Sequence, residues 1–330
     1  MKIIQIIIIL LTIVYLFSCT NPYEGEGGWQ EDWIATINST GDSLNYIIKE
    51  RAENVQFTPD DTKIIVNREE KGIWSMNLDG TDYKNLTDSL LVHSALPSIC
   101  TDSLGFIKIT FAAYSIEEST SDIYIMNIDG NNLINITNTP DVRDGYPHFS
   151  PDSDSIVYAT YSDSLITISI IDKDGENSRI IISNTPSTKL YQRYYYPRFN
   201  ISGDKIYYKF LGEKRGLYSV NIDDSTTNTL LFAGSLETYF LSMPYDGSKI
   251  VFSCNSHIYI MNNNGSGIMD LGYGRSAMIS SNGLKIVFNG IGIMNIDGSN
   301  IIEPEKGSNP VFSSNGDKIV FNAVRTFPED

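Results

Sequence analysis

The chain has 330 residues and a formal net charge of −16 at neutral pH, with 41% hydrophobic and 11% aromatic residues. This composition is typical of a packed globular protein and excludes a largely disordered one. The acidic balance excludes a nucleic-acid partner, because binding to phosphate requires a surface rich in Lys and Arg, and it also excludes electrostatic attachment to an anionic membrane.

The N-terminus has the pattern of an export signal. Lys2 is followed by an apolar run from Ile3 to Phe17. As a helix this run would span about 22 Å, which is too short for the hydrocarbon core of a bilayer, so residues 1–18 are interpreted as a signal peptide. The residues "LFSC" that end at Cys19 resemble the lipobox of bacterial lipoproteins. This resemblance implies that Cys19 is lipidated; an ordinary signal peptide that leaves Cys19 unmodified is the alternative.

Residues 19–32 are predicted to form a flexible tether after the lipidated cysteine. The stretch "TNPYEGEGGWQED" is rich in Gly and acidic residues, a composition that is typical of linkers. By resemblance to lipoproteins, Thr20 after the cysteine favours sorting to the outer membrane. We therefore expect an outer-membrane lipoprotein that faces the periplasm or the cell surface and contacts the membrane only through its lipid.

Two phrases alternate through the rest of the chain, residues 33–330. One is typified by "IYIMNIDG" from Ile123 and the other by "FSSNGDKIVF" from Phe312, and each occurs seven times. Apolar residues alternate within them with a period of two, which predicts strands. The Asp-Gly and Asn-Gly pairs that follow favour type I′ turns, so each phrase is predicted to form a hairpin. The recurrent Asn, as in Asn77 and Asn262, is expected to hydrogen-bond the backbone of its turn.

The hairpins predict the fold class. Two hairpins in each repeat of 33 to 50 residues make four-stranded units, which are the blades of a β-propeller. The chain begins with a second hairpin, from Trp33 to Ile48, and ends with a first hairpin, from Pro310 to Val324. These two are predicted to complete one shared blade that closes the ring. The prediction is an all-β, seven-bladed β-propeller, and six blades with an irregular N-terminal extension are the alternative.

The arms "YPHFSPDSDSIVYA" and "ISIIDKDG" resemble the repeats of TolB-type β-propellers. The resemblance covers the chain from Trp33 to Val324 and implies the propeller fold. By the same resemblance TolB has six blades and a separate N-terminal domain, whereas here the tether leads directly into the first strand. A role in the TolB envelope system is therefore not carried over.

The candidate binding residues come from the longer connections between hairpins. Antiparallel strands place the Asp-Gly turns on one face and the longer connections on the other, where binding sites usually lie. The stretch "YQRYYYPRF" concentrates Tyr and Arg, which are enriched at binding surfaces. The candidates are Arg143, Tyr146, His148, Tyr191, Arg193, Tyr194, Tyr195 and Arg198. In the alternative interpretation these residues are structural, and Tyr196, which matches Tyr146 before a shared proline, packs between blades.

Metal and catalytic motifs are not apparent in the sequence. His93, His148 and His257 fall in different repeats without ligand spacing, so no metal and no cofactor is expected. Cys100 and Cys254 fall three predicted blades apart, too far for a disulfide, and are expected to behave as small buried side chains.

The sequence therefore predicts a monomeric, lipid-anchored binding protein that is not an enzyme. Its partner is expected to be a protein or glycan of the cell envelope, bound through the long-loop face. The alternative is a carbohydrate-active enzyme of the polysaccharide-lyase kind with its site at the mouth of the channel, because oligogalacturonate lyases are propellers with a histidine-bound metal.

Overall fold

The computed structural model describes residues 28–68, 71–88, 93–114, 120–185, 193–234 and 241–328. They belong to two compact units, one comprising residues 32–324 and the other the remaining described residues at the two ends. In these ranges no helix is long and apolar enough to cross a membrane. Cys19 lies outside the described residues. Strand β1 begins at Gly28, so residues 28–32, which were expected in the tether, are already part of a strand.

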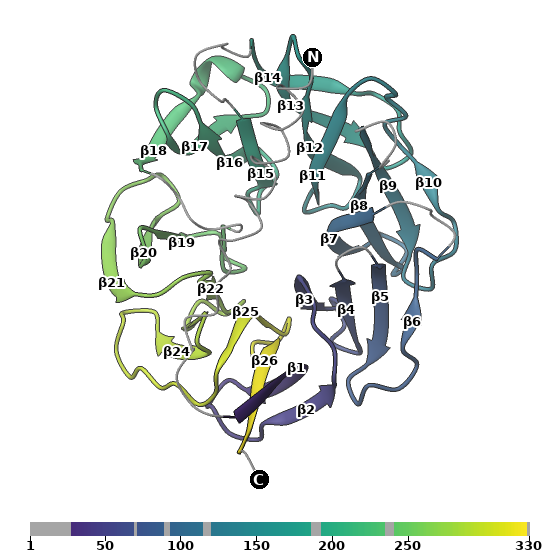
Figure 1. Ribbon diagram of the computed structural model, residues 1–330. Helices are drawn as coiled ribbons and strands as arrows, with labels where there is room; N and C mark the ends of the chain where they lie inside the picture. Colours follow the sequence, from purple (N-terminus) through teal and green to yellow (C-terminus); the bar gives the residue numbers. More distant parts are fainter. Residues whose placement is uncertain are drawn as a thin grey trace, which may run out of the picture. The chain divides into compact units, whose positions relative to one another are not determined.

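The unit of residues 32–324 consists of antiparallel sheets arranged around a common axis (Figure 1). One sheet contains β3 (Asn54–Phe57), β4 (Lys63–Arg68), β5 (Gly72–Asn77) and β6 (Lys84–Asn85). A larger sheet contains β7 (His93–Thr101), β8 (Ile107–Tyr114), β9 (Ser121–Asn127), β10 (Ile134–Asn135), β11 (Arg143–Phe149), β12 (Ser155–Tyr161), β13 (Ile166–Asp172) and β14 (Arg179–Asn184).

The following sheets continue around the same axis. The next contains β15 (Arg193–Phe199), β16 (Lys205–Leu211), β17 (Gly216–Asn221) and β18 (Thr229–Ala233), with the short 3₁₀ helix η1 (Ser225–Thr227) before β18. Two three-stranded sheets contain β19 (Lys249–Cys254), β20 (His257–Asn262) and β21 (Met269–Tyr273), and β22 (Met278–Ile279), β23 (Lys285–Phe288) and β24 (Gly292–Asn295). The last contains β1 (Gly28–Asn38), β2 (Asn45–Ile48), β25 (Gly307–Phe312) and β26 (Lys318–Pro328).

This arrangement confirms the prediction of an all-β propeller. The number of blades stays a prediction, because β9 and β11 pair through Ser121 and Arg143 and so join two repeats into one sheet of eight strands.

The last sheet has the composite origin that the sequence predicts. Its strand order is β2-β1-β26-β25, so the first and last hairpins of the chain share one sheet. The backbone N–H of Ser39 donates to the carbonyl of Asp317 at 2.7 Å. Ala35 and Ile37 are buried in one cluster with Phe312 and Phe321. The two ends of the unit therefore hold each other in place through ordinary sheet hydrogen bonds and apolar packing.

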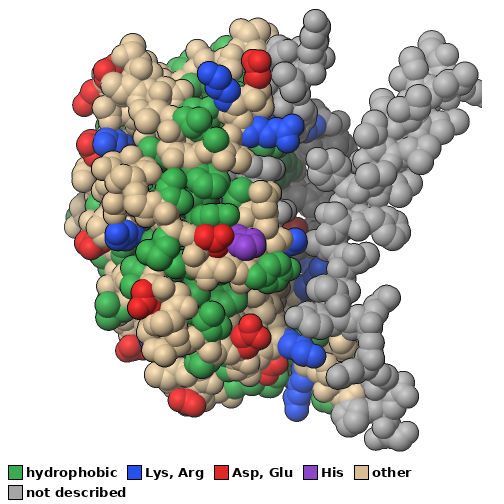
Figure 2. All heavy atoms as spheres, turned by 90° about the vertical axis from the view of Figure 1, so that its left-hand side faces the viewer, with side chains coloured by type: hydrophobic (Ala, Val, Ile, Leu, Met, Phe, Trp, Pro, Cys, Tyr) green, Lys and Arg blue, Asp and Glu red, His purple; other side chains and the backbone are tan. Residues whose placement is uncertain are grey.

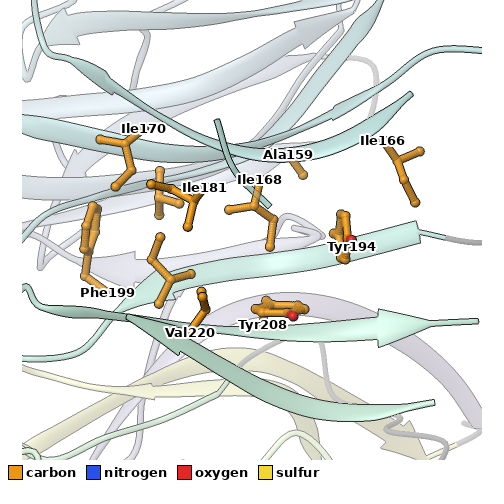
Figure 3. Close-up of a cluster of buried hydrophobic side chains, with 11 residues drawn as sticks. Ala159, Ile166, Ile168, Ile170, Ile181, Tyr194, Phe199, Tyr208 and Val220 are labelled. Atoms are coloured by element: carbon orange, nitrogen blue, oxygen red, sulfur yellow. The ribbon is translucent and has the colours of Figure 1, made fainter. Parts of the chain in front are cut away.

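Apolar clusters lie between adjacent sheets. In the cluster of Figure 3, Ile168 of β13 packs near Tyr194 of β15 and Tyr208 of β16, and all three side chains are less than 5% exposed. Because both faces of a blade pack on neighbours, the middle strands are buried on both sides, as the continuous burial of β13 shows. Alternating side chains on one strand thus serve two different interfaces. On the outer wall near β18, β21 and β24, hydrophobic side chains lie between scattered charged ones (Figure 2).

The turn type differs from the sequence prediction. Gly80 has a φ of 83° and its N–H donates to the carbonyl of Asn77 at 3.0 Å, but Asp79 does not have a positive φ. A type I′ turn requires positive φ at both central residues, so that prediction is wrong. The turn is instead a wider one in which Gly occupies the left-handed position. The amide of Asn77 donates to the hydroxyl of Thr81 at 2.9 Å, rather than to backbone as expected, and Asn262 and Ser266 repeat the pattern.

Both described cysteines are free and buried, as predicted. Cys100 packs with Phe149 and Tyr158, whereas Cys254 packs with Phe252 and Met261 in another cluster. Burial raises the pKa of the Cys100 thiol to about 11, so this side chain behaves as a small hydrophobic residue.

Candidate functional site

A cavity of about 180 Å³ lies between the inner strands β3, β7, β11, β15 and β25 and the start of β22. The strands that supply its walls are far apart in the sequence, and Figure 1 shows them at the centre of the ring of sheets. The lining residues are Asn54, Val55, Gln56, Pro97, Ser98, Ile99, Tyr146, Pro147, His148, Tyr196, Pro197, Arg198, Ser276, Met278, Asn309, Pro310 and Val311. None of these lining residues is acidic. Closure of the ring therefore creates a site with one guanidinium and one imidazole.

Repeat positions explain why these side chains meet. One set of lining residues occupies the same place in each repeat, directly before a large apolar residue of the inner strand. Its members are Gln56, Ser98, His148, Arg198, Met278 and Val311. Equivalent positions of a propeller lie at the same height along the axis, so they form one ring of side chains. His148 and Arg198 are neighbours in this ring, and the other members are neutral.

Two bulges, one in β11 and one in β15, direct the side chains of His148 and Arg198 into the cavity. The pairing of β11 with β12 shifts between Gly145 and His148, and the pairing of β15 with β16 shifts between Tyr195 and Arg198. Each bulge contains a Tyr-Pro pair, and proline fits there because it lacks the N–H that a regular ladder needs.

The tyrosines of these bulges have a strained backbone. Tyr146 and Tyr196 have φ values of 57° and 53°, a region that bulky residues rarely adopt. Asn309 and Ser276, with φ of 53° and 51°, line the same cavity. Such strain costs of the order of 1–3 kcal/mol at each residue and persists only where surrounding structure enforces it. Four residues with this strained backbone therefore lie around one cavity.

A tyrosine cluster, defined here as Tyr146, Tyr161, Tyr195 and Tyr196, adjoins the cavity. The ring centroids of Tyr146 lie 4.5 Å from those of Tyr196 and 5.4 Å from those of Tyr195. The guanidinium of Arg193 lies 5.0 Å from the ring centroid of Tyr161. Burial, together with the neighbouring phenols, raises the pKa of Tyr161 well above its usual value. Tyr161 is therefore neutral at physiological pH, and the cluster offers aromatic faces and hydroxyl groups.

His148 is uncharged at neutral pH. Burial, and secondly the nearby charge of Arg198, lower its pKa to about 3. Its Nδ1 lies 2.8 Å from the carbonyl oxygen of Phe149. Because a carbonyl only accepts hydrogen bonds, we assign the proton of the neutral ring to Nδ1, which leaves Nε2 as an acceptor.

Arg198 carries the positive charge of the cavity. Burial lowers its pKa to about 10, so the guanidinium remains protonated at neutral pH. One nitrogen, Nη1, donates to the carbonyl of Leu241 at 3.2 Å. This contact with the next sheet orients the guanidinium.

The structure brings together only some of the residues predicted from sequence. Tyr146, His148 and Arg198 line the cavity. Tyr195 belongs to the adjoining tyrosine cluster, and Arg193 lies over the ring of Tyr161 in that cluster. Arg143 is exposed at the start of β11.

The prediction for Tyr194 has to be corrected, and Tyr191 lies outside the described residues. Tyr194 is only 4% exposed, and its ring packs against Tyr208 and Phe210 in the core, so the prediction that it lies on a binding surface is wrong. Strand alternation is the reason, because Arg193 and Tyr195 point away from the face that buries Tyr194.

Sequence reasoning missed the remaining members of the ring. Gln56, Ser98, Met278 and Val311 are ordinary residues with no chemical motif. Alignment of the repeats on the apolar residue that follows each of them could have found them. Tyr196 was interpreted as packing between blades. Its ring does contact Tyr146 of the neighbouring repeat, and it also lines the cavity.

The cavity does not have the donor set of a metal site. Among the described residues, no three His, Cys, Asp or Glu side chains gather where they could hold a metal ion. At the cavity itself, His148 stands beside a guanidinium, which repels a cation.

The comparisons with known proteins define the fold. No family model matches the chain, and no curated protein matches it either. Similar solved structures include a putative TolB from Agrobacterium tumefaciens, at 17% identity and a TM-score of 0.56, covering 92% of this chain and 100% of that chain. An oligogalacturonate lyase in complex with manganese is 15% identical, with a TM-score of 0.56, and the match covers 87% of this chain and 80% of that chain.

A third similar structure is a puromycin hydrolase, at 11% identity and a TM-score of 0.57. The match covers 90% of this chain but only 57% of that one. At these identities the likeness concerns the fold alone. The TolB-type β-propeller that the repeats suggested is confirmed as the architecture, whereas activity has to be argued from the site.

Proposed function

We propose that the chain is an exported, lipid-anchored β-propeller that binds a protein or glycan of the cell envelope without catalysing a reaction. The observation that carries this proposal is the cavity with the adjoining tyrosine cluster. Tyr and Arg dominate binding hot spots because they provide large amphipathic surfaces and forked donors. Here the tyrosines are concentrated at one end of one cavity, next to Arg193 and Arg198.

The binding proposal is tested by photo-crosslinking in the native envelope. The site variant is Arg193→Gln/Tyr195→Ala, and the matched control is Arg215→Gln/Tyr245→Ala, at exposed residues that do not line the cavity. Thermal unfolding first establishes that both variants fold. A partner that crosslinks to the wild type and the control but not to the site variant supports the proposal. Equal crosslinking of all three would contradict it.

We further propose that the propeller ring has seven blades. The support is the seven copies of each hairpin phrase, together with the eight-stranded sheet, which contains two full repeats and so counts as two blades. In a seven-bladed ring, residues 28–48 complete the closing blade. Deleting them should therefore abolish cooperative unfolding, whereas a six-bladed ring with a dispensable extension would still fold.

The lipid anchor is proposed from the sequence alone. Residues 1–18 would be removed as a signal peptide, and residues 19–27 would connect the lipidated Cys19, held in the outer membrane, to the domain that begins with β1. The test is metabolic labelling with a fatty acid in a bacterial host. The label should be lost in Cys19→Ser and retained in Cys100→Ser.

A polysaccharide lyase is the second candidate. It is favoured by the fold likeness to an oligogalacturonate lyase in complex with manganese and by the imidazole of His148 in the cavity. The donor set described above does not fit a metal, so no step is derived through one. A substrate screen that follows the ultraviolet absorbance of unsaturated sugars tests this candidate. Activity that is lost in His148→Gln would replace the binding proposal.

A further inference from the structure

Two amide side chains of the cavity wall present hydrogen-bond acceptors. The Nε2 of Gln56 donates to the carbonyl of Pro97 at 2.9 Å, and the Nδ2 of Asn309 donates to the carbonyl of Glu53 at 2.8 Å. Because a carbonyl only accepts hydrogen bonds, these contacts fix the orientation of both amides and leave Oε1 of Gln56 and Oδ1 of Asn309 as acceptors. Within the described residues, no group donates to either oxygen.

The imidazole of His148 supplies a third acceptor. Since Nδ1 faces the carbonyl of Phe149 at 2.8 Å, Nε2 is the acceptor of the neutral ring. The lowered pKa of His148 keeps the ring in this form at physiological pH. Nothing in the described part of the chain donates to Nε2. The three acceptors come from β3, β11 and β25, so a ligand that reaches them carries several donors around its edge.

Hydroxyl groups are the donors that fit this wall. An ammonium donor would require a carboxylate nearby, and none of the described lining residues is acidic. Proline has no N–H to offer a ligand, and four prolines line the cavity: Pro97, Pro147, Pro197 and Pro310. A neutral ligand with several hydroxyl groups pairs with the acceptors and brings no unpaired charge into the cavity.

Size and apolar surface define the frame of the ligand. A single water requires about 10–15 Å³ of such space, so a cavity of about 180 Å³ accepts roughly a dozen non-hydrogen atoms. A hexose is of this size. Tyr146 and Tyr196 line the same cavity, and Val55, Ile99 and Met278 contribute apolar surface. This lining favours a ring, either aromatic or the apolar face of a sugar, over an extended flexible chain.

We propose that the central cavity binds a neutral ring of about the size of a hexose that carries several hydroxyl groups. The hydroxyl groups donate to Gln56, His148 and Asn309, and one face of the ring packs against the tyrosines Tyr146 and Tyr196. This inference rests on the proposed binding function and gives that function a ligand class. Two sources supply this chemistry, a neutral sugar and a polyphenol, and the experiment distinguishes them.

Titration of the full-length protein, followed by ligand-observed NMR, tests the proposal. Glucose, galactose and mannose are the neutral sugar probes, and pyrogallol is the polyphenol probe. Cyclohexanol keeps a ring of similar size with a single hydroxyl. We expect at least one hexose or pyrogallol to bind, and cyclohexanol to bind roughly tenfold more weakly, because it leaves acceptors of the wall unpaired. Stronger binding of a hexose indicates a sugar ligand, and stronger binding of pyrogallol indicates a polyphenol.

Removal of single hydroxyl groups tests the acceptors one at a time. The ligands are the monodeoxy derivatives of the hexose that binds best, or catechol and phenol if pyrogallol binds best. On the wild-type protein, loss of a hydroxyl that donates to the wall should weaken binding several-fold, whereas loss of a hydroxyl that faces elsewhere should have little effect.

Two variants locate the binding. Gln56→Met and His148→Phe each remove one acceptor and keep a side chain of similar size. Each should weaken the parent ligand several-fold and abolish the penalty for one hydroxyl, so that the ligand without that hydroxyl binds as well as the parent. Lys214→Met, at an exposed residue outside the cavity lining, should keep the wild-type affinities. The comparison among probes on the wild type needs no variant, so a variant that fails to fold leaves the test intact.

The proposal is overturned if neither a hexose nor pyrogallol binds, if cyclohexanol binds as tightly as they do, or if Gln56→Met and His148→Phe both bind like the wild type. Its failure is distinguishable from that of the binding function. Loss of the crosslinked partner in Arg193→Gln/Tyr195→Ala would still support a binding protein that uses the tyrosine cluster without a hydroxylated ring in the cavity.

Discussion

Tyr146 and Tyr196 pack edge to face with ring centroids 4.5 Å apart, and they occupy equivalent positions of two successive inner strands. Both precede a proline, and both have a positive φ. The bulges that create this backbone also place His148 and Arg198 in the cavity wall. One local distortion, repeated in neighbouring repeats, thus produces both the aromatic end and the polar wall of the candidate site.

The strained backbone at Tyr196 predicts an unusual order of substitutions. Asn tolerates positive φ, whereas β-branched Val does not. We expect Tyr196→Val to lower the free energy of unfolding by about 1–2 kcal/mol more than Tyr196→Asn. At Tyr259, a strand residue without positive φ, the order should reverse, because Val fits a strand better than Asn. Urea unfolding of the four variants measures this difference. The same order at both positions would show that Tyr196 is unstrained.

The ring closure predicts an energetic coupling across the chain. The carboxylate of Asp61 accepts hydrogen bonds from the hydroxyl of Ser314 at 2.8 Å and from its N–H at 2.6 Å, although 253 residues separate them. We expect Asp61→Asn and Ser314→Ala each to lower stability by about 0.5–1.5 kcal/mol, and the double variant to lower it by less than the sum. Asn is chosen because Asp61 has a φ of 56°. Strict additivity in the cycle of denaturant unfolding experiments would mean that the contact does not stabilise closure.

The buried imidazole predicts a pH dependence of stability. The pKa of His148, lowered to about 3, lies below its unfolded value, so the unfolded chain binds more protons between these two pKa values. Stability therefore falls as pH decreases below about 6.5. Arg198, the charged group that faces His148, stays protonated over this range.

His148→Gln should remove this contribution. Between pH 7 and pH 5 the wild type is expected to lose about 1–2 kcal/mol more than the variant, and urea unfolding at both values measures the loss. Equal acid sensitivity in His148→Gln and the wild type would show that His148 titrates normally.

Two glycines of the sheets are predicted to differ in how well they tolerate substitution by Ala. A Cβ atom at Gly216 would lie 2.2 Å from the carbonyl oxygen of Phe232, whereas at Gly145 it would lie 3.9 Å from the hydroxyl of Tyr114. Because backbone cannot move aside cheaply, we expect Gly216→Ala to destabilise by about 2–3 kcal/mol. Gly145→Ala should leave stability unchanged or raise it by up to about 1 kcal/mol, since neither glycine needs a positive φ. Thermal unfolding ranks the two, and equal melting temperatures would contradict the close approach at Gly216.

Residue patterns near each other in the sequence were sufficient for the strands and for much of the ring. Alternating apolar residues and Asp-Gly turns predicted the hairpins, and the half-repeats at the two ends predicted the sheet that β1 and β26 share. The turn type was wrong because only Gly80 and its counterparts adopt positive φ, not the preceding Asp. A dipeptide indicates where a hairpin turns, but the length of the loop decides which residue becomes left-handed.

The candidate site was predicted less well, for a physical reason. The Tyr- and Arg-rich stretch identified the correct strand, but composition does not say which side of a strand faces the core. Tyr194 is therefore buried while Arg198 lines the cavity. Side-chain direction there depends on a bulge, and a bulge depends on how β15 pairs with β16.

The sequence by itself thus determined the repeating hairpins, since strand and turn preferences act between residues close in the chain. Only the tertiary structure decided that Gln56, His148, Arg198 and Val311 face one another across a cavity. Such contacts join residues hundreds of positions apart and exist only after the first and last hairpins have closed the ring.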